Sequence, residues 1–322
     1  MIKKFRLPIS ILLSLVIFQI IALIMSSIPL SRHPVDELVY RLNYSSDFSE
    51  NIILGDSVTR DSIGRFRPNN KKIINLTVDE PTGIVGSYFL LNRYILKNNN
   101  KKIKNVLIIA TPEFFSNINY GRHIKNRVYL NSIFKRKNEK QILKILNILP
   151  EKKKRIELAK ELISIEKNLI RPLTGLIKNK KKTILIDSEF FNLEKIKEFP
   201  KKNSVSIEIF EERYEKNLEF NKESLLIYEK ICNLSEKYDF KVHIVFAPTP
   251  LTLYKKWDND GQLLNIINSF KHKKTKDCKI EFFDLNKVKT FPDYAFRDNF
   301  HLKISGWAPL YSSIIYDYID KY

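Results

Sequence analysis

Five short apolar runs alternate with helical patterns along this chain, and this alternation limits the folds open to it. Runs of this length, rich in β-branched or aromatic residues, are typical of strands buried on both faces. Strands that alternate with helices form a mostly parallel sheet covered by helices on both sides. The sequence therefore predicts an α/β fold, a three-layer doubly wound parallel sheet. The expected strands are residues 51–54, 72–75, 104–110, 241–247 and 279–285.

Helical patterns flank these runs. In the segment 221–238, Leu225, Tyr228 and Ile231 recur on one face, as an amphipathic helix requires. A long stretch at about 118–220, dense in Lys and helical in pattern, predicts a basic insertion within one domain at 50–322. The insertion could lie over the edge of the sheet, on a membrane surface or against a partner. The other expected helices are at about 82–97, 259–271 and 305–321.

The N-terminus has the pattern of a membrane anchor. Residues 7–30 contain no charged side chain, follow three cations, and are long enough to cross the roughly 30 Å hydrocarbon core of a bilayer. A cleaved signal peptide is the alternative, but the apolar stretch exceeds the usual ~7–15 residues and no A-x-A-like site follows. We therefore expect a cytoplasmic tail at 1–6, one transmembrane signal anchor at 7–30 and a linker at 31–49. The positive-inside rule then predicts a single-pass protein of the cell membrane, with the remaining chain outside the cytoplasm.

Composition argues against several classes of function. The net charge of +20 is spread along the chain and does not form one stripe, so no nucleic-acid partner is expected. The five histidines and two cysteines show no metal-ligand spacing, so the sequence predicts neither a metal nor a cofactor. A bridge between Cys232 and Cys278 is possible, but the pattern favours two buried thiols.

Ser57 follows the first expected strand in Gly55-Asp56-Ser57, where open parallel sheets bind ligands. A serine hydroxyl needs a general base to act as a nucleophile, and that base needs a third group to orient it. His301, after the last expected strand, lies on the same edge of the sheet, and Asp298 comes three residues before it. These residues predict a catalytic triad of Ser57, His301 and Asp298. Asp56 is interpreted as a structural acceptor for the amides of the turn.

This pairing resembles the SGNH/GDSL hydrolase superfamily, whose first block has Gly-Asp-Ser and whose last block has Asp-x-x-His. Each block alone arises often by chance, and the resemblance depends on their order, their placement after strands and their distance apart. With its predicted anchor, the chain is more similar to the branch of the superfamily that acts on cell-envelope glycans, such as alginate O-acetylation and D-alanine transfer proteins. The resemblance implies the flavodoxin-like SGNH fold and a membrane-anchored serine acyl-esterase or O-acyltransferase. An acylated glycan or acyl donor would be the ligand, and a multi-span membrane acyltransferase would be a partner.

The middle blocks of the superfamily differ here. The resemblance implies an oxyanion hole formed by the backbone N–H groups of Ser57 and of Thr77, which stands where the family has Gly. After the third strand, where the family has Asn, the chain has Thr111, Pro112 and Glu113. Thr111 and Glu113 are therefore expected to line the substrate site. A missing oxyanion donor costs on the order of 10²–10³ in rate, so these differences leave three alternatives: modest activity, a different donor, or a pseudoenzyme.

Three alternatives remain at this point. Ser57 can be only the N-cap of the following helix, because serine is a favoured cap. Asp298 and His301 can be an ordinary surface pair in a turn. The protein can also be a non-catalytic envelope-assembly or glycan-binding protein on the same fold.

Overall fold

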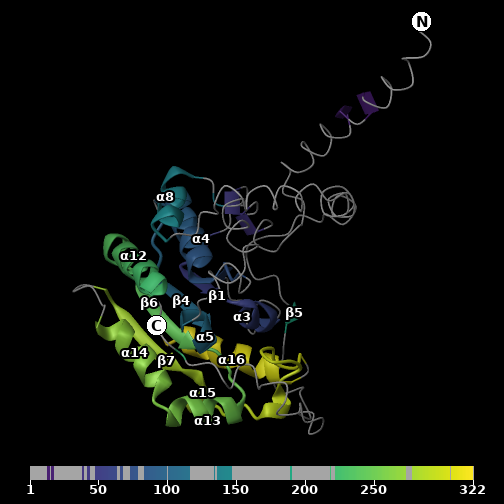
Figure 1. Ribbon diagram of the computed structural model, residues 1–322. Helices are drawn as coiled ribbons and strands as arrows, with labels where there is room; N and C mark the ends of the chain where they lie inside the picture. The colour runs from purple at the N-terminus through teal and green to yellow at the C-terminus, as the bar shows by residue number, and fades with distance from the viewer. Residues whose placement is uncertain are drawn as a thin grey trace, which may run out of the picture.

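A computed structural model describes most of the α/β domain (Figure 1). The described residues are 13–14, 16–17, 38–39, 42–43, 48–63, 66–67, 73–78, 83–99, 101–116, 134, 136–146, 189–190, 218, 222–272, 278–304 and 306–321.

The centre of the domain is a five-stranded sheet in which every pair of neighbours is parallel. The strands are β1 (Asn51–Gly55), β3 (Ile74–Asn75), β4 (Asn105–Ala110), β6 (Lys241–Phe246) and β7 (Ile280–Asp284). Their order in space is β3-β1-β4-β6-β7, so the second strand along the chain lies outside the first. This order is compatible with a flavodoxin-like fold and changes direction between β1 and β4. All five strands predicted from the sequence are confirmed.

Helices cover both faces of the sheet, as the near-continuous apolar strands require. Alternate residues of β4 enter two separate cores: Val106 and Ile108 pack against one set of helices, and Leu107 and Ile109 against the other. The first set is α4 (Gly83–Lys97), α5 (Pro112–Ser116), α8 (Lys137–Ile145), α12 (Lys222–Tyr238), α13 (Leu251–Asn259) and α14 (Gln262–His272). The second is α3 (Ser57–Ser62), α15 (Leu285–Val288) and α16 (Trp307–Ile319).

Helix α8 is held to α4 by a buried ion pair. Arg93 donates from Nε and Nη2 to the two carboxylate oxygens of Glu139, at 2.6 and 2.7 Å. Both side chains are buried, and Arg93 also lies over the ring of Phe134. Breaking such a pair leaves an uncompensated buried charge, so this contact fixes the place of α8 on the domain.

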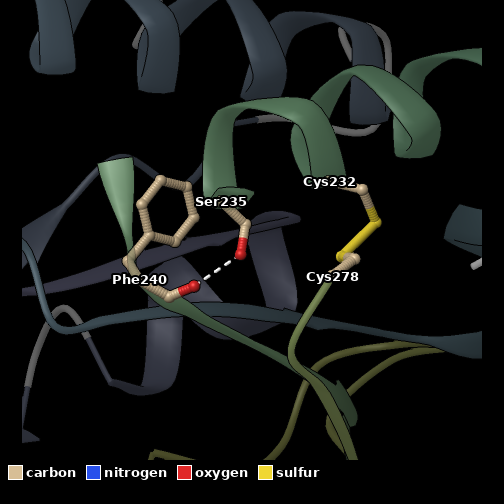
Figure 2. Close-up of a disulfide and its surroundings, with 4 residues drawn as sticks. All are labelled: Cys232, Ser235, Phe240 and Cys278. Atoms are coloured by element: carbon tan, nitrogen blue, oxygen red, sulfur yellow. Dashed lines mark hydrogen bonds between the residues drawn. A yellow bond between two sulfur atoms is a disulfide. The ribbon is translucent and has the colours of Figure 1, made fainter. Parts of the chain in front are cut away.

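Cys232 and Cys278 form a disulfide, so the expectation of two buried thiols is wrong (Figure 2). Cys232 lies in α12, and Cys278 comes just before β7. Val242 N–H donates to the carbonyl of Lys279, which brings the start of β7 beside β6, the strand that follows α12. The two Cα atoms are then 5.2 Å apart, within the usual range for a disulfide. The pairing depends on this strand register, which the positions of the two cysteines do not reveal.

Two predicted regions lie largely outside the described residues. Of the insertion at 118–220, the structure describes Phe134, residues 136–146, Leu218 and the short strand β5 (Glu189–Phe190), which pairs with β2 (Phe66–Arg67) in a second small sheet. Of the anchor at 7–30, it describes four residues, all helical. Within the described part of the chain, no helix is long and apolar enough to cross a membrane.

Candidate functional site

The candidate site begins at the turn from β1 into α3, where Gly55 allows the backbone to approach β4. A Cβ atom on Gly55 would lie 1.9 Å from the carbonyl oxygen of Ile109, and the φ of Gly55 is +153°. No other residue fits there without moving the strand. The same carbonyl accepts a hydrogen bond from Thr59 Oγ1 at 2.7 Å, which ties the first turn of α3 to β4. Ser57 is thereby fixed at the point where the strand order reverses.

Asp56, and not Ser57, is the N-cap of α3. Its Oδ1 accepts the N–H groups of Val58 and Thr59, and its Oδ2 accepts the N–H and hydroxyl of Thr111. This confirms Asp56 as a structural acceptor. Burial raises the pKa of the Asp56 carboxyl, although the hydrogen bonds from Thr111 and Thr59 lower it in part. Because Asp56 fills the capping position, the Ser57 hydroxyl is not required for it.

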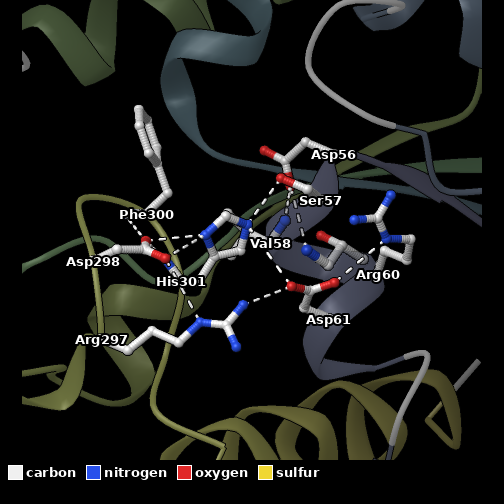
Figure 3. Close-up of polar contacts among 10 residues, drawn as sticks. Asp56, Ser57, Val58, Arg60, Asp61, Arg297, Asp298, Phe300 and His301 are labelled. Carbon is white, nitrogen blue, oxygen red and sulfur yellow. Dashed lines mark hydrogen bonds and ion pairs between the residues drawn. The ribbon is translucent and has the colours of Figure 1, made fainter. Parts of the chain in front are cut away.

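The Ser57 hydroxyl instead lies against His301, 244 residues away in the sequence (Figure 3). Ser57 Oγ is 3.0 Å from His301 Nε2, and His301 Nδ1 is 3.0 Å from each carboxylate oxygen of Asp298. A carboxylate only accepts, so Nδ1 carries the hydrogen and Nε2 accepts from the serine hydroxyl. The structure brings together the three residues that were predicted as a triad, in the order and tautomer that proton transfer from Ser57 needs.

A short turn at residues 296–302 presents His301. Phe296 and Leu302 form an antiparallel bridge, and both are buried in the core beneath α16. Inside the turn, Asp298 Oδ1 accepts the N–H groups of Phe300 at 2.8 Å and of His301 at 2.7 Å. Partial burial raises the pKa of Asp298, but these two N–H groups and the imidazole outweigh it, and the net shift is downward. Asp298 therefore stays ionised and can stabilise a charged imidazole.

The two predicted oxyanion donors differ in their surroundings. Ser57 N–H belongs to the first residue of α3, which has no carbonyl of its own helix to bind. Thr77 lies beside Gly55, since Val78 N–H donates to the carbonyl of Gly55 at 2.8 Å. However, Thr77 N–H donates to Asn75 Oδ1 at 3.0 Å within its own loop. Thr77 would have to exchange that bond to hold an oxyanion, and its role stays a prediction.

Thr111 and Glu113 follow β4 at the same edge of the sheet. Both are buried, with about 4% of each residue exposed, and Thr111 is engaged with Asp56. The charge of Glu113 contributes to the raised pKa of Asp56, so the two carboxyls lie near one another. Thr111 thus supports the turn that carries Ser57. Contact of either residue with a substrate stays a prediction.

Two further residues at the site were not predicted. Asp61 lies on α3 and Arg297 in the His301 turn, and Arg297 Nη2 donates to Asp61 Oδ2 at 2.7 Å (Figure 3). The same Asp61 oxygen is 4.0 Å from His301 Nε2. Asp61 comes four residues after Ser57, so helical periodicity places it on the same face of α3, which is the signal that could have identified it.

No group of three or more His, Cys, Asp or Glu side chains that could hold a metal ion occurs among the described residues. The sequence matches no model of a known protein family, and a comparison with curated proteins found no match.

Proposed function

We propose that the protein is a serine acyl-esterase or O-acyltransferase of the SGNH/GDSL type, anchored in the cell membrane and acting outside the cytoplasm on a cell-envelope glycan. The observation that carries the proposal is the hydrogen-bonded series Ser57, His301 and Asp298. It lies at the carboxyl edge of a parallel sheet, next to the point where the strand order reverses. Ligands bind at such points in open α/β sheets, and the same series of side chains serves acyl transfer on unrelated folds.

The geometry supports the following mechanism. Ser57 Oγ attacks an acyl carbonyl carbon while its proton passes to His301 Nε2, 3.0 Å away. Asp298 holds the imidazole through Nδ1 and stabilises its positive charge, and Ser57 N–H donates to the developing oxyanion. Nε2 then returns the proton to the departing alcohol. Water or a glycan hydroxyl, deprotonated by His301, resolves the acyl-enzyme and determines whether the outcome is hydrolysis or transfer.

Two features support the proposed location. The Cys232–Cys278 disulfide fits an oxidising compartment, because thiols in the cytosol are kept reduced. Residues 7–30 contain no charged side chain and are long enough to cross a bilayer. A multi-span membrane acyltransferase that supplies the acyl group is part of this proposal and rests on the resemblance alone.

A second candidate is a non-catalytic assembly or glycan-binding protein on the same scaffold. It is favoured by the engaged N–H of Thr77 and by the residues after β4, Thr111, Pro112 and Glu113, which provide no amide side chain for an oxyanion. Under this candidate, the contact between Ser57 and His301 would stabilise the turn without chemistry.

Replacement of Ser57 by Ala separates the two candidates. Because Asp56 caps α3, Ser57→Ala should leave the melting temperature nearly unchanged. Hydrolysis of a chromogenic acyl ester should fall by several orders of magnitude, and His301→Ala should do similar damage, since triad residues act as a unit. Ser62→Ala is the matched control, because it makes the same change in the same helix. A folded Ser57→Ala protein with full esterase activity that also restores glycan acylation in cells would leave only the scaffold function.

A further inference from the structure

A second carboxylate lies beside the nitrogen that must receive the serine proton. Asp61 Oδ2 is 4.0 Å from His301 Nε2, on the side of the ring that faces Ser57. The other Asp61 oxygen is 3.3 Å from Arg60 Nε, and Arg297 binds Oδ2 at 2.7 Å (Figure 3). Asp61 and His301 are each about a quarter exposed, so water screens their interaction only in part.

This arrangement creates a conflict for the proposed reaction. An opposite charge within about 4–6 Å favours the protonated form of an imidazole and typically raises its pKa by about one or more. An uncompensated Asp61 would therefore hold the proton on Nε2, and a protonated Nε2 cannot accept from Ser57. It would also attract Nε2 away from the serine. A base in this position needs the Asp61 charge to be balanced.

Arg297 is placed to provide that balance. Its guanidinium binds Asp61 through Nη2, and its Nε is 3.6 Å from Asp298 Oδ2, so one cation contacts both carboxylates that flank the imidazole. Its backbone N–H donates to the carbonyl of His301 at 2.8 Å, which closes the turn. The described charged groups around His301 are thus Asp61 and Arg60 from α3 and Arg297 and Asp298 from its own turn.

We propose that Arg297 is a positioning residue that neutralises Asp61 and thereby keeps Nε2 of His301 available to Ser57 in mildly acidic surroundings. The inference rests on the proposed serine chemistry and adds to it a control of the pH range in which the base works. Asp61 and Arg297 also join the first and last blocks of the site, 236 residues apart. A clamp that acted only mechanically would change how fast the serine reacts without changing the pH at which it begins to react.

The test measures the reaction of Ser57 with an alkyl fluorophosphonate, which needs no knowledge of the substrate. A bond forms between Ser57 Oγ and phosphorus, the phosphorus–fluorine bond breaks, fluoride leaves, and the serine proton passes to His301 Nε2. The labelling rate of the full-length protein is followed from pH 4 to pH 9, and melting temperatures verify folding. Lys104→Gln is the matched control, because it breaks the ion pair with Glu50 at the opposite edge of the sheet.

Arg297→Gln should move the acid limb of the rate profile upward by roughly half to one pH unit, because Asp61 then keeps only Arg60 as a counter-ion. Asp61→Asn should move the acid limb to lower pH. The double variant should return the acid limb nearly to the wild-type pH, and Arg297→Lys should leave it unchanged. Slower labelling in Arg297→Gln and Asp61→Asn with an unmoved acid limb would overturn the inference and leave only a mechanical clamp. A folded wild-type protein that is not labelled at Ser57 would instead overturn the proposed function itself.

Discussion

Acid should destabilise this protein through one buried histidine. His243 in β6 is 1% exposed, with Nδ1 2.9 Å from the Tyr318 hydroxyl and Nε2 3.1 Å from Asn105 Oδ1. The amide of Asn105 donates to Asn51, so Oδ1 is its acceptor, and Nε2 must carry the hydrogen. Nδ1 then accepts from Tyr318, and the folded protein holds a neutral ring in a satisfied network.

The size of the effect follows from the pKa of His243. Burial lowers this pKa from 6.5 to about 4, while the charge of Glu281 opposes the shift and that of Lys241 adds to it. Above about pH 6.5 the ring is neutral in both states and the contribution is fully present. As the pH falls toward 4, the unfolded chain takes up a proton that the folded protein does not. The gap between a pKa of 6.5 and one of about 4 corresponds to about 3 kcal/mol of unfolding free energy lost across this window.

Urea unfolding of the full-length protein at several pH values measures this loss. Both tryptophans, Trp257 and Trp307, are buried in the domain, so their fluorescence reports its unfolding. His243→Gln keeps a donor and an acceptor but does not titrate. The stability advantage of wild type over this variant should shrink by about 3 kcal/mol from pH 7 to pH 4. An advantage that stays constant over that range would refute the reasoning.

Two further predictions concern the scaffold. Replacing Cys232 and Cys278 by Ser should lower the free energy of unfolding by about 2–4 kcal/mol, because the bridge closes a loop between residues separated by 46 positions. A reducing agent should lower the urea midpoint of wild type to that of the double variant, and an unchanged midpoint would contradict the assignment. Gly55→Ala should cost at least about 3 kcal/mol or abolish folding, because its Cβ meets a backbone carbonyl at 1.9 Å. A melting temperature within a few degrees of wild type would contradict that packing.

The sheet was predictable because buried parallel strands are continuous apolar runs. The run at 104–110 differs from β4 by one residue at its start, and the predicted helix at 305–321 contains α16. Helix α13 was missed because only Leu253 and Trp257 are buried along it, which leaves a weak apolar pattern after Pro250. The short pairing of β2 with β5 was missed because two-residue strands have no periodicity to detect.

The candidate site was likewise predictable from the sequence only in part. Ser57 and His301 were identifiable because each follows a predicted strand, and all carboxyl ends of a parallel sheet lie at one edge. The ion pair of Asp61 with Arg297 could not be read from the sequence, since it depends on how the 296–302 turn is placed over α3. The position of the N-cap was also ambiguous, because Asp56 and Ser57 are both favoured capping residues and only the backbone conformation distinguishes them.

The span of 244 residues between Ser57 and His301 has a consequence for biosynthesis. Ser57 leaves the ribosome early, whereas His301 follows every strand of the central sheet along the chain. Under the proposed function, a nascent chain would therefore hold Ser57 without its general base until the residues up to His301 have been made. Activation of the serine would then wait for synthesis of the whole central sheet.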